Sequence, residues 1–275
     1  MLWIYDIPTW QLISLISALF LGINFVGTLL FRWMLGFRRA DRVPEKVELY
    51  ATFFGNHGVY MSILVGLLAV GVYNNMSEAD GKAHSEAIAA GALYRCFTMY
   101  PEPMRGRMQA SMLAYLDQVQ KKEWPMQQRG EVPPTTHPTL GAIFQELIAF
   151  NPNNKPMEIA HAETLHAIRE FYQKRRDRLF ALEDNIAPLL WYVVIIGSLV
   201  TMVLVWLMDM GLVDHLMYGS LSAFFQAALI GYILAMDNPF MGDQSVSPEP
   251  YQQVVQELRT MPADLIPANS QPTNK

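Results

Sequence analysis

Long uncharged apolar runs dominate the hydrophobic pattern of this chain. Four segments contain no Asp, Glu, Lys or Arg: Trp10–Phe31, Ala51–Tyr73, Leu189–Met208 and Leu216–Met236. Each has 20 to 23 residues, close to the roughly 20 helical residues that cross a bilayer core about 30 Å thick. A buried core helix in a soluble protein is the alternative for any one run, but four such runs favour membrane spans. Because lipid offers the backbone no hydrogen-bond partners, the runs are predicted to be helices.

The four predicted spans form two pairs along the chain, with a polar region between them. We therefore expect an all-α membrane protein with four transmembrane helices in two pairs and a helical soluble region between the pairs. Its expected parts are a first transmembrane pair (1–73), the soluble region (74–187), a second transmembrane pair (188–236), and a polar C-terminal segment with a disordered tail (237–275).

Prolines and glycines divide the predicted soluble region into helical stretches near 77–99, 104–124, 139–150 and 157–187. Because proline is tolerated in a first helical turn or at a kink, the last stretch is expected to run almost directly through Pro188 into the third span. The short turn at 208–214 predicts that spans three and four form a tight antiparallel hairpin. A short amphipathic helix is expected near the C-terminus, with the apolar residues Tyr251, Val254, Val255 and Leu258.

A basic run precedes the third span by 11 to 15 residues: Lys174, Arg175, Arg176 and Arg178. One interpretation is a solvated helix face, paired with nearby acidic side chains and lipid headgroups. The other is a vestibule that concentrates anions, because a cleft of one charge sign focuses the field and raises the local counter-ion concentration.

Polar residues within the spans are few: Asn24, Asn56, His57 and Gln226. His57 is the one ionisable side chain among them, and intramembrane ionisable groups mark functional sites. It is interpreted either as a helix–helix hydrogen bond or as part of a permeation path. On the second span, helical spacing brings five small or apolar residues to one face: Gly55, Val59, Ile63, Gly66 and Val70. Such a face serves either close helix packing or an apolar ring around a pore.

No motif supports catalysis or a bound cofactor. The single cysteine, Cys96, excludes an intrachain disulfide, and there is no Walker loop, HExxH or GxSxG pattern. Glu163, His166 and Glu170 could share a helix face and hold a metal, although a solvated surface is the expected interpretation. We expect no enzyme, no cofactor, no metal site and no nucleic-acid partner. The net charge of −5 is modest.

Several short sequences resemble the bacterial bestrophin-like domain family. They include Leu93-Tyr94-Arg95, Tyr100-Pro-Glu-Pro103, and above all the two segments after the fourth span, Asp237-Asn-Pro-Phe-Met-Gly-Asp243 and Val246-Ser-Pro-Glu-Pro250. The resemblance covers roughly residues 45–260. This family is in turn distantly similar to the bestrophins, which are pentameric anion channels.

The resemblance implies a role for two parts of the chain. The stretch 45–78 matches the pore-lining helix and its hydrophobic neck, so the pore-lining residues would be Gly55, Asn56, His57, Val59 and Ile63. The post-span segment Asp237, Asn238, Pro239, Phe240 and Asp243 matches the Asn-Pro-Phe segment after the fourth bestrophin span. Bulky aromatic neck residues are missing here. The acidic cluster that binds calcium in animal bestrophins is also missing, because only Asp243 closely follows Asn238–Phe240. Gating by calcium is therefore not expected.

The expected function is a channel for anions such as chloride, with a pore between the subunits of a homo-oligomer, pentameric by resemblance. A non-conducting membrane scaffold or sensor, acting through its helical soluble region, is the alternative. The basic connection at 32–50 favours placing the soluble region outside the cell under the positive-inside rule. The basic run before span three and the resemblance favour the opposite, and we expect the inner (plasma) membrane with a cytoplasmic soluble region.

Overall fold

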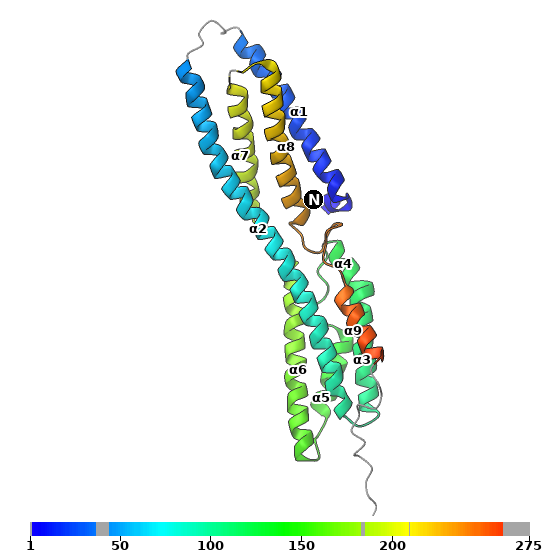
Figure 1. Cartoon of the computed structure of the whole chain (residues 1–275). Helices are drawn as coiled ribbons and strands as arrows, with labels where there is room; N and C mark the ends of the chain where they lie inside the picture. The colour runs from blue at the N-terminus through cyan, green and yellow to red at the C-terminus, as the bar shows by residue number, and fades with distance from the viewer. Residues whose placement is uncertain (1, 37–43, 183–184, 209, 261–275) are drawn as a thin grey trace, which may run out of the picture. The chain divides into compact units, whose positions relative to one another are not determined.

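A computed structural model describes residues 2–36, 44–182, 185–208 and 210–260. Within these ranges the chain is helical and contains no strand, which confirms the all-α prediction. The α-helices are α1 (Thr9–Gly36), α2 (Pro44–Cys96), α3 (Met104–Gln118), α4 (Trp124–Gln128), α5 (Pro138–Ala149), α6 (Lys155–Phe180), α7 (Pro188–Leu207), α8 (Leu212–Met236) and α9 (Glu249–Thr260) (Figure 1). Short helical turns are η1 (Leu2–Asp6), η2 (Phe97–Met99) and the π-helical η3 (Val119–Glu123). The predicted disordered tail and the basic residues Arg38, Arg39 and Arg42 lie outside the described residues.

The chain divides into two compact units. The first comprises residues 1–76 and 184–245, and the second comprises 77–183 and 246–275. Helix α2 therefore contributes to both units, and the C-terminal segment is divided between them. The sequence shows no Pro or Gly between Tyr73 and Gly81, so the helix continues although its apolar character ends near Tyr73.

Four helices of the described chain are long and apolar enough to cross a membrane: Thr9–Met34, Glu48–Met99, Pro188–Leu207 and Leu212–Met236. Their packing in the first unit does not follow the order of the sequence, because α1 packs most extensively against α8 (Figure 1). Glycines make this approach close: a Cβ added to Gly231 would lie 3.0 Å from Cγ1 of Ile13. The first and last spans of the chain are thus direct neighbours.

The expected continuation of α6 into the third span is wrong. Helix α6 ends at Phe180 and α7 begins at Pro188. Ala187 is extended, with ψ of 131°, because a residue before proline is driven out of the helical region. Pro188 then occupies the first turn of α7, where its missing N–H costs no hydrogen bond.

The second unit is a bundle formed by the C-terminal part of α2 with α3, α5, α6 and α9. Helices α3 and α5 pack together, and α9 lies against α3 (Figure 1). Tyr251 and Leu258 of α9 are buried as the sequence predicts. The core of the second unit includes buried aromatic residues from several segments: Phe97, Tyr100, Tyr115, Trp124 and Phe171.

Candidate functional site

The apolar face of α2 is exposed in the first unit. Val59, Ile63 and Val70 have 55%, 58% and 58% of their surface exposed, and Gly55 and Gly66 are exposed beside them. The opposite face packs inward, where Val65 and Val72 are buried against Ile233 of α8 and Leu68 adjoins them. The described residues of this chain therefore cover one side of α2 and leave the other side free.

Helix α2 is the least covered of the four candidate spans. Only 6% of its most apolar 18-residue stretch is buried, whereas the corresponding stretches of α1, α7 and α8 are 22%, 28% and 39% buried. Apolar side chains within a membrane span contact either lipid or protein. The open face of α2 is therefore available to lipid or to another subunit.

His57 differs from the other predicted pore residues. Its Nε2 lies 2.9 Å from the carbonyl oxygen of Gly197 in α7, and the side chain is half-buried. Gly197 is closely approached here, because a Cβ at this position would overlap the Sδ of Met61 at 2.2 Å. The structure thus brings Gly55, Asn56, Val59 and Ile63 to the exposed side of α2 and turns His57 toward α7, as its helix–helix interpretation requires.

The two other intramembrane amides join helices or lie within one. Asn24 is buried, and its Oδ1 accepts a hydrogen bond of 3.2 Å from the indole N–H of Trp206 in α7. Gln226 donates from Nε2 to the Ser222 hydroxyl at 3.3 Å within α8. Both contacts are structural, and neither amide lies on the exposed face of α2.

The post-span segment begins with a carboxylate that ties α8 to the start of α7. Asp237 accepts hydrogen bonds from the backbone N–H of Ile186 at 2.8 Å and from the indole N–H of Trp191 at 3.3 Å. Burial raises the pKa of Asp237, and these two hydrogen bonds oppose that rise. A carboxylate held in this way ties the end of α8 to the start of α7.

The rest of the segment folds back on the N-terminus. The Asn238 side chain accepts the Phe240 N–H at 3.2 Å, and the Pro239 and Phe240 rings are buried. Gly242 takes the left-handed conformation with φ of 84°, which glycine adopts without strain. Asp243 then accepts the Thr9 N–H at 3.0 Å and the Thr9 hydroxyl, at the first turn of α1. The hydrogen bonds to Thr9 lower the pKa of Asp243.

The basic run on α6 does not form a single vestibule. Arg175 and Arg178 have 1% and 0% of their surface exposed, so both interpretations, the solvated helix face and the anion-concentrating vestibule, are wrong for these two residues. Residues 174, 175, 176 and 178 point in different directions because each step along a helix turns about 100°. Arg176 is exposed, and Lys174 lines a shallow hollow with Glu78, Lys82 and Asp177.

A buried cluster of two glutamates and two arginines occupies the core of the second unit. Arg175 donates from Nη2 to Oε1 of Glu123 at 2.7 Å and from Nη1 to Oε2 at 2.8 Å. Arg178 donates from Nε to Glu86 at 2.5 Å and from Nη2 to Glu123 at 2.8 Å. The two positive and two negative charges balance, as buried charges must. This cluster, here called the Glu–Arg core, was not predicted from the sequence.

Aromatic and polar side chains complete the Glu–Arg core. The hydroxyl groups of Tyr115 and Tyr251 donate to Glu86, and Gln127 accepts from Arg178. Burial raises the pKa of both tyrosines well above the ordinary value. Burial also acts to raise the pKa of Glu123, but the hydrogen bonds of Arg175 and the charge of Arg178 outweigh it and leave that pKa lowered.

The Glu–Arg core joins α2, α3, η3, α4, α6 and α9. Glu123 lies at the end of η3, a π-helical turn between α3 and α4. One extra residue in the turn rotates the following side chains about the helix axis, and such turns are frequent at functional sites. No group of three or more His, Cys, Asp or Glu side chains suited to a metal occurs in the described part of the chain.

The described chain has four helices long and apolar enough to cross a membrane, and one of them has an uncovered apolar face. These features define a helical membrane protein. Residues 18–251 match the family described as Bestrophin-like domain, so the chain belongs to that family, as the sequence motifs predict. Its fold is similar to that of a bacterial bestrophin homologue from Klebsiella pneumoniae carrying a leucine-to-threonine mutation, with a TM-score of 0.58. The match has 12% identity and covers 90% of this chain and 97% of the other. A comparison with curated proteins finds no match.

Proposed function

We propose that this chain forms an anion channel whose pore lies between the subunits of a cyclic homo-oligomer. Membership of the Bestrophin-like domain family and the bestrophin-like fold support an anion channel. The observation that carries the inter-subunit pore is the open face of α2, the least covered of the candidate spans. Four spans with so few polar residues cannot enclose an aqueous path in one subunit.

The constriction is assigned to Val59 and Ile63, which stand one helical turn apart on that face. Copies around an axis would stack their side chains as successive apolar rings, and a narrow apolar ring stops flow when water leaves it. Gly55 and Asn56, on the same exposed side, would lie toward one mouth. Without fixed charge in the rings, anions would be favoured by surrounding dipoles such as amides and helix N-termini.

The assembly is proposed to be a pentamer, by family resemblance. Native mass measurement of the purified protein in mild detergent tests it directly. Five copies are expected, and a protein that is monomeric throughout would remove the inter-subunit pore. Conduction is tested separately by chloride flux into liposomes. An intact oligomer that gives no flux above empty vesicles across pH and voltage would favour the scaffold or sensor.

The soluble residues are proposed to be cytoplasmic, with the protein in the inner membrane. The Lys and Arg residues before α7 support this orientation. A C-terminal reporter that is active only in the cytoplasm should be active, and a periplasm-specific reporter should be silent. The opposite pattern would reverse the orientation.

A further inference from the structure

A cavity on α6, within the second unit, is lined mainly by polar and cationic side chains. Its volume is about 510 Å³, within the range of small-molecule sites. The residues lining it are Thr135, Arg169, Tyr172, Gln173, Arg175, Arg176, Asp177 and Leu179. Because Glu123 balances the charge of Arg175, the two exposed arginines against one aspartate leave a formal charge of +1, so the cavity favours an anion.

Arg175 forms the fixed inner side of this cavity, where Glu123 balances its charge. Four of its N–H bonds are committed, to both oxygens of Glu123, to the Tyr115 hydroxyl and to the Pro134 carbonyl. Its Nε is buried and has no hydrogen-bond partner among the described residues. Because these hydrogen bonds hold it in place and it is buried, Arg175 shapes the inner wall of the cavity and leaves direct contact with a ligand to the exposed arginines.

Arg169 and Arg176 supply the guanidinium groups that face a ligand; the Nε of Arg169 donates to the Leu165 carbonyl at 3.0 Å, which leaves its two Nη groups for binding. Both side chains are exposed, and neither forms an ion pair within the part of the chain that the structure describes. They stand seven residues apart on α6, which brings them to one face about two turns apart, with Tyr172 between them. Arginine suits this role because its planar fork matches the two oxygens of a carboxylate or phosphate.

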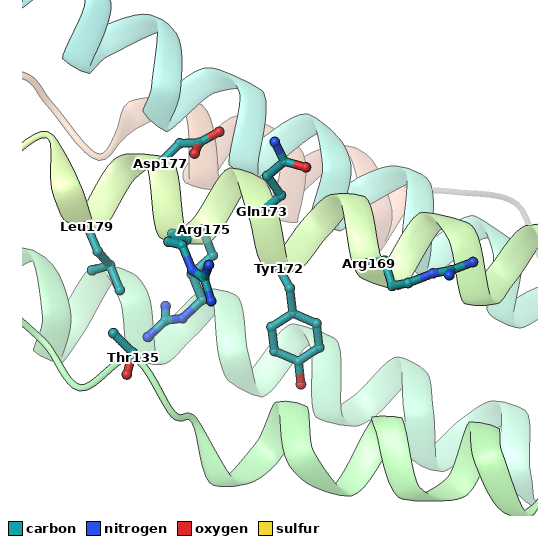
Figure 2. Close-up of a pocket in the computed structure, with 8 residues that line it drawn as sticks. Thr135, Arg169, Tyr172, Gln173, Arg175, Asp177 and Leu179 are labelled. Atoms are coloured by element: carbon teal, nitrogen blue, oxygen red, sulfur yellow. The ribbon is translucent and has the colours of Figure 1, made fainter.

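Tyr172 gives the cavity an aromatic wall. Its ring packs edge-on against Phe144 of α5, with centroids 6.3 Å apart and planes at 88°. In the view of Figure 2, Tyr172 extends from α6 toward the side that carries Thr135, whereas Gln173 and Asp177 extend the other way. The one carboxylate of the lining is therefore turned from the Tyr172 side.

We propose that this cavity binds a small organic anion, whose carboxylate or phosphate group is held by Arg169 and Arg176 beside the fixed Arg175. The remainder of the ligand lies against Tyr172. The cavity joins the Glu–Arg core through Arg175 and the neighbouring Pro134–Thr135 backbone, so an occupant would stabilise the second unit. This binding is separate from conduction, since no cavity residue belongs to a candidate membrane span.

Thermal unfolding of the full chain in lipid nanodiscs tests the proposal. The probes are inorganic phosphate, succinate and chloride, compared at equal ionic strength. Phosphate, succinate or both should raise the unfolding temperature in a saturable way, while chloride should not. Stabilisation by phosphate alone indicates a phosphorylated ligand, and stabilisation by succinate alone indicates a carboxylate. No stabilisation beyond chloride by either probe would overturn the proposal.

Arg176→Gln should weaken the apparent affinity for the effective probe about tenfold or more, since charge-assisted hydrogen bonds contribute about 1.5–3 kcal/mol. Arg107→Gln is the control, because Arg107 is an exposed arginine on α3 outside the cavity, where it pairs with Glu146. If Arg176→Gln lowers the unfolding temperature in the absence of a probe, Arg169→Gln is the second variant to test. If the cavity variants and the control lose the same apparent affinity for the probe, the stabilisation comes from non-specific charge screening. That result would overturn the proposed site.

Discussion

Arg175 and Glu123 face each other as a two-pronged ion pair inside the second unit, with N···O distances of 2.7 and 2.8 Å. Both side chains are withdrawn from water. Isolated charges in this position would cost several kcal/mol each, so the pair depends on its neighbours, Arg178 and Glu86, for balance. The integrity of the second unit therefore depends on all four charges together.

Glu86→Gln should destabilise the protein by about 3 kcal/mol, because it leaves Arg178 buried without its main carboxylate. The substitution keeps the side-chain volume, so lost packing contributes little. Denaturant unfolding followed by circular dichroism measures the loss. Glu78→Gln, on the same helix but with 66% of its side chain exposed, should change stability by less than about 0.5 kcal/mol. Similar losses in the two variants would contradict the buried cluster as the cause.

Stability should fall on mild acidification because of His137. Burial is the largest cause that lowers the pKa of His137, and the charge of Arg175 adds to it, while Glu123 opposes it. The unfolded chain therefore takes up a proton near pH 6.5, where the folded chain resists it, and the folded state loses stability as pH falls below about 6.5.

His137→Phe keeps a ring against Tyr115, whose centroid lies 5.1 Å away, and removes the titrating group. Unfolding measured from pH 7.5 to about 5 should show a smaller acid-dependent loss in this variant than in the unmodified protein. The exposed His166 provides a control, His166→Gln, which should retain the original pH profile. An unchanged slope in His137→Phe would assign the acid sensitivity to other groups.

Val59→Ala and Ile63→Ala should raise chloride leak through liposome-reconstituted protein, because smaller side chains widen an apolar constriction. Both positions are more than half exposed in the chain, so the folding of one subunit should change little. Leu68→Ala on the packed face should instead cost about 2 kcal/mol of stability with little change in leak. If Leu68→Ala alone alters flux, the assigned pore face is wrong.

Asp243→Ala should destabilise the first unit by about 1 kcal/mol, since the carboxylate accepts the Thr9 N–H at the start of α1. Because the hydrogen bonds to Thr9 lower the pKa of Asp243, its stabilisation is present above the unfolded pKa near 3.9. It is lost as pH falls through the lower, folded value. Thermal unfolding in detergent measures the change, with Gln244→Ala as a neighbouring control. If Asp243→Ala loses no stability at neutral pH, water replaces the carboxylate as the hydrogen-bond acceptor for Thr9.

The sequence alone determined the membrane character, the helical class and the family. Span length and the absence of charge are local properties, since the bilayer thickness fixes how many apolar residues a helix needs. The Asp237–Asp243 segment carried the family resemblance because a short motif is also local. Proline and glycine positions located the helical stretches of the soluble region. They overextended α6, which ends at Phe180 well before the next proline, Pro188.

Only the tertiary structure decided which helices pack together and which charges are buried. The packing of α1 against α8 joins segments about 200 residues apart in sequence, and nothing in either run names its partner. The sequence contains one weak indication of the Glu–Arg core, because its two arginines recur with apolar residues at three- and four-residue spacing: Ile168, Phe171, Arg175, Arg178 and Leu182. Both arginines thus lie on the apolar stripe of α6. An arginine on such a stripe is buried only when carboxylates from other helices reach it, and that meeting of Glu86 and Glu123 is a property of the folded bundle.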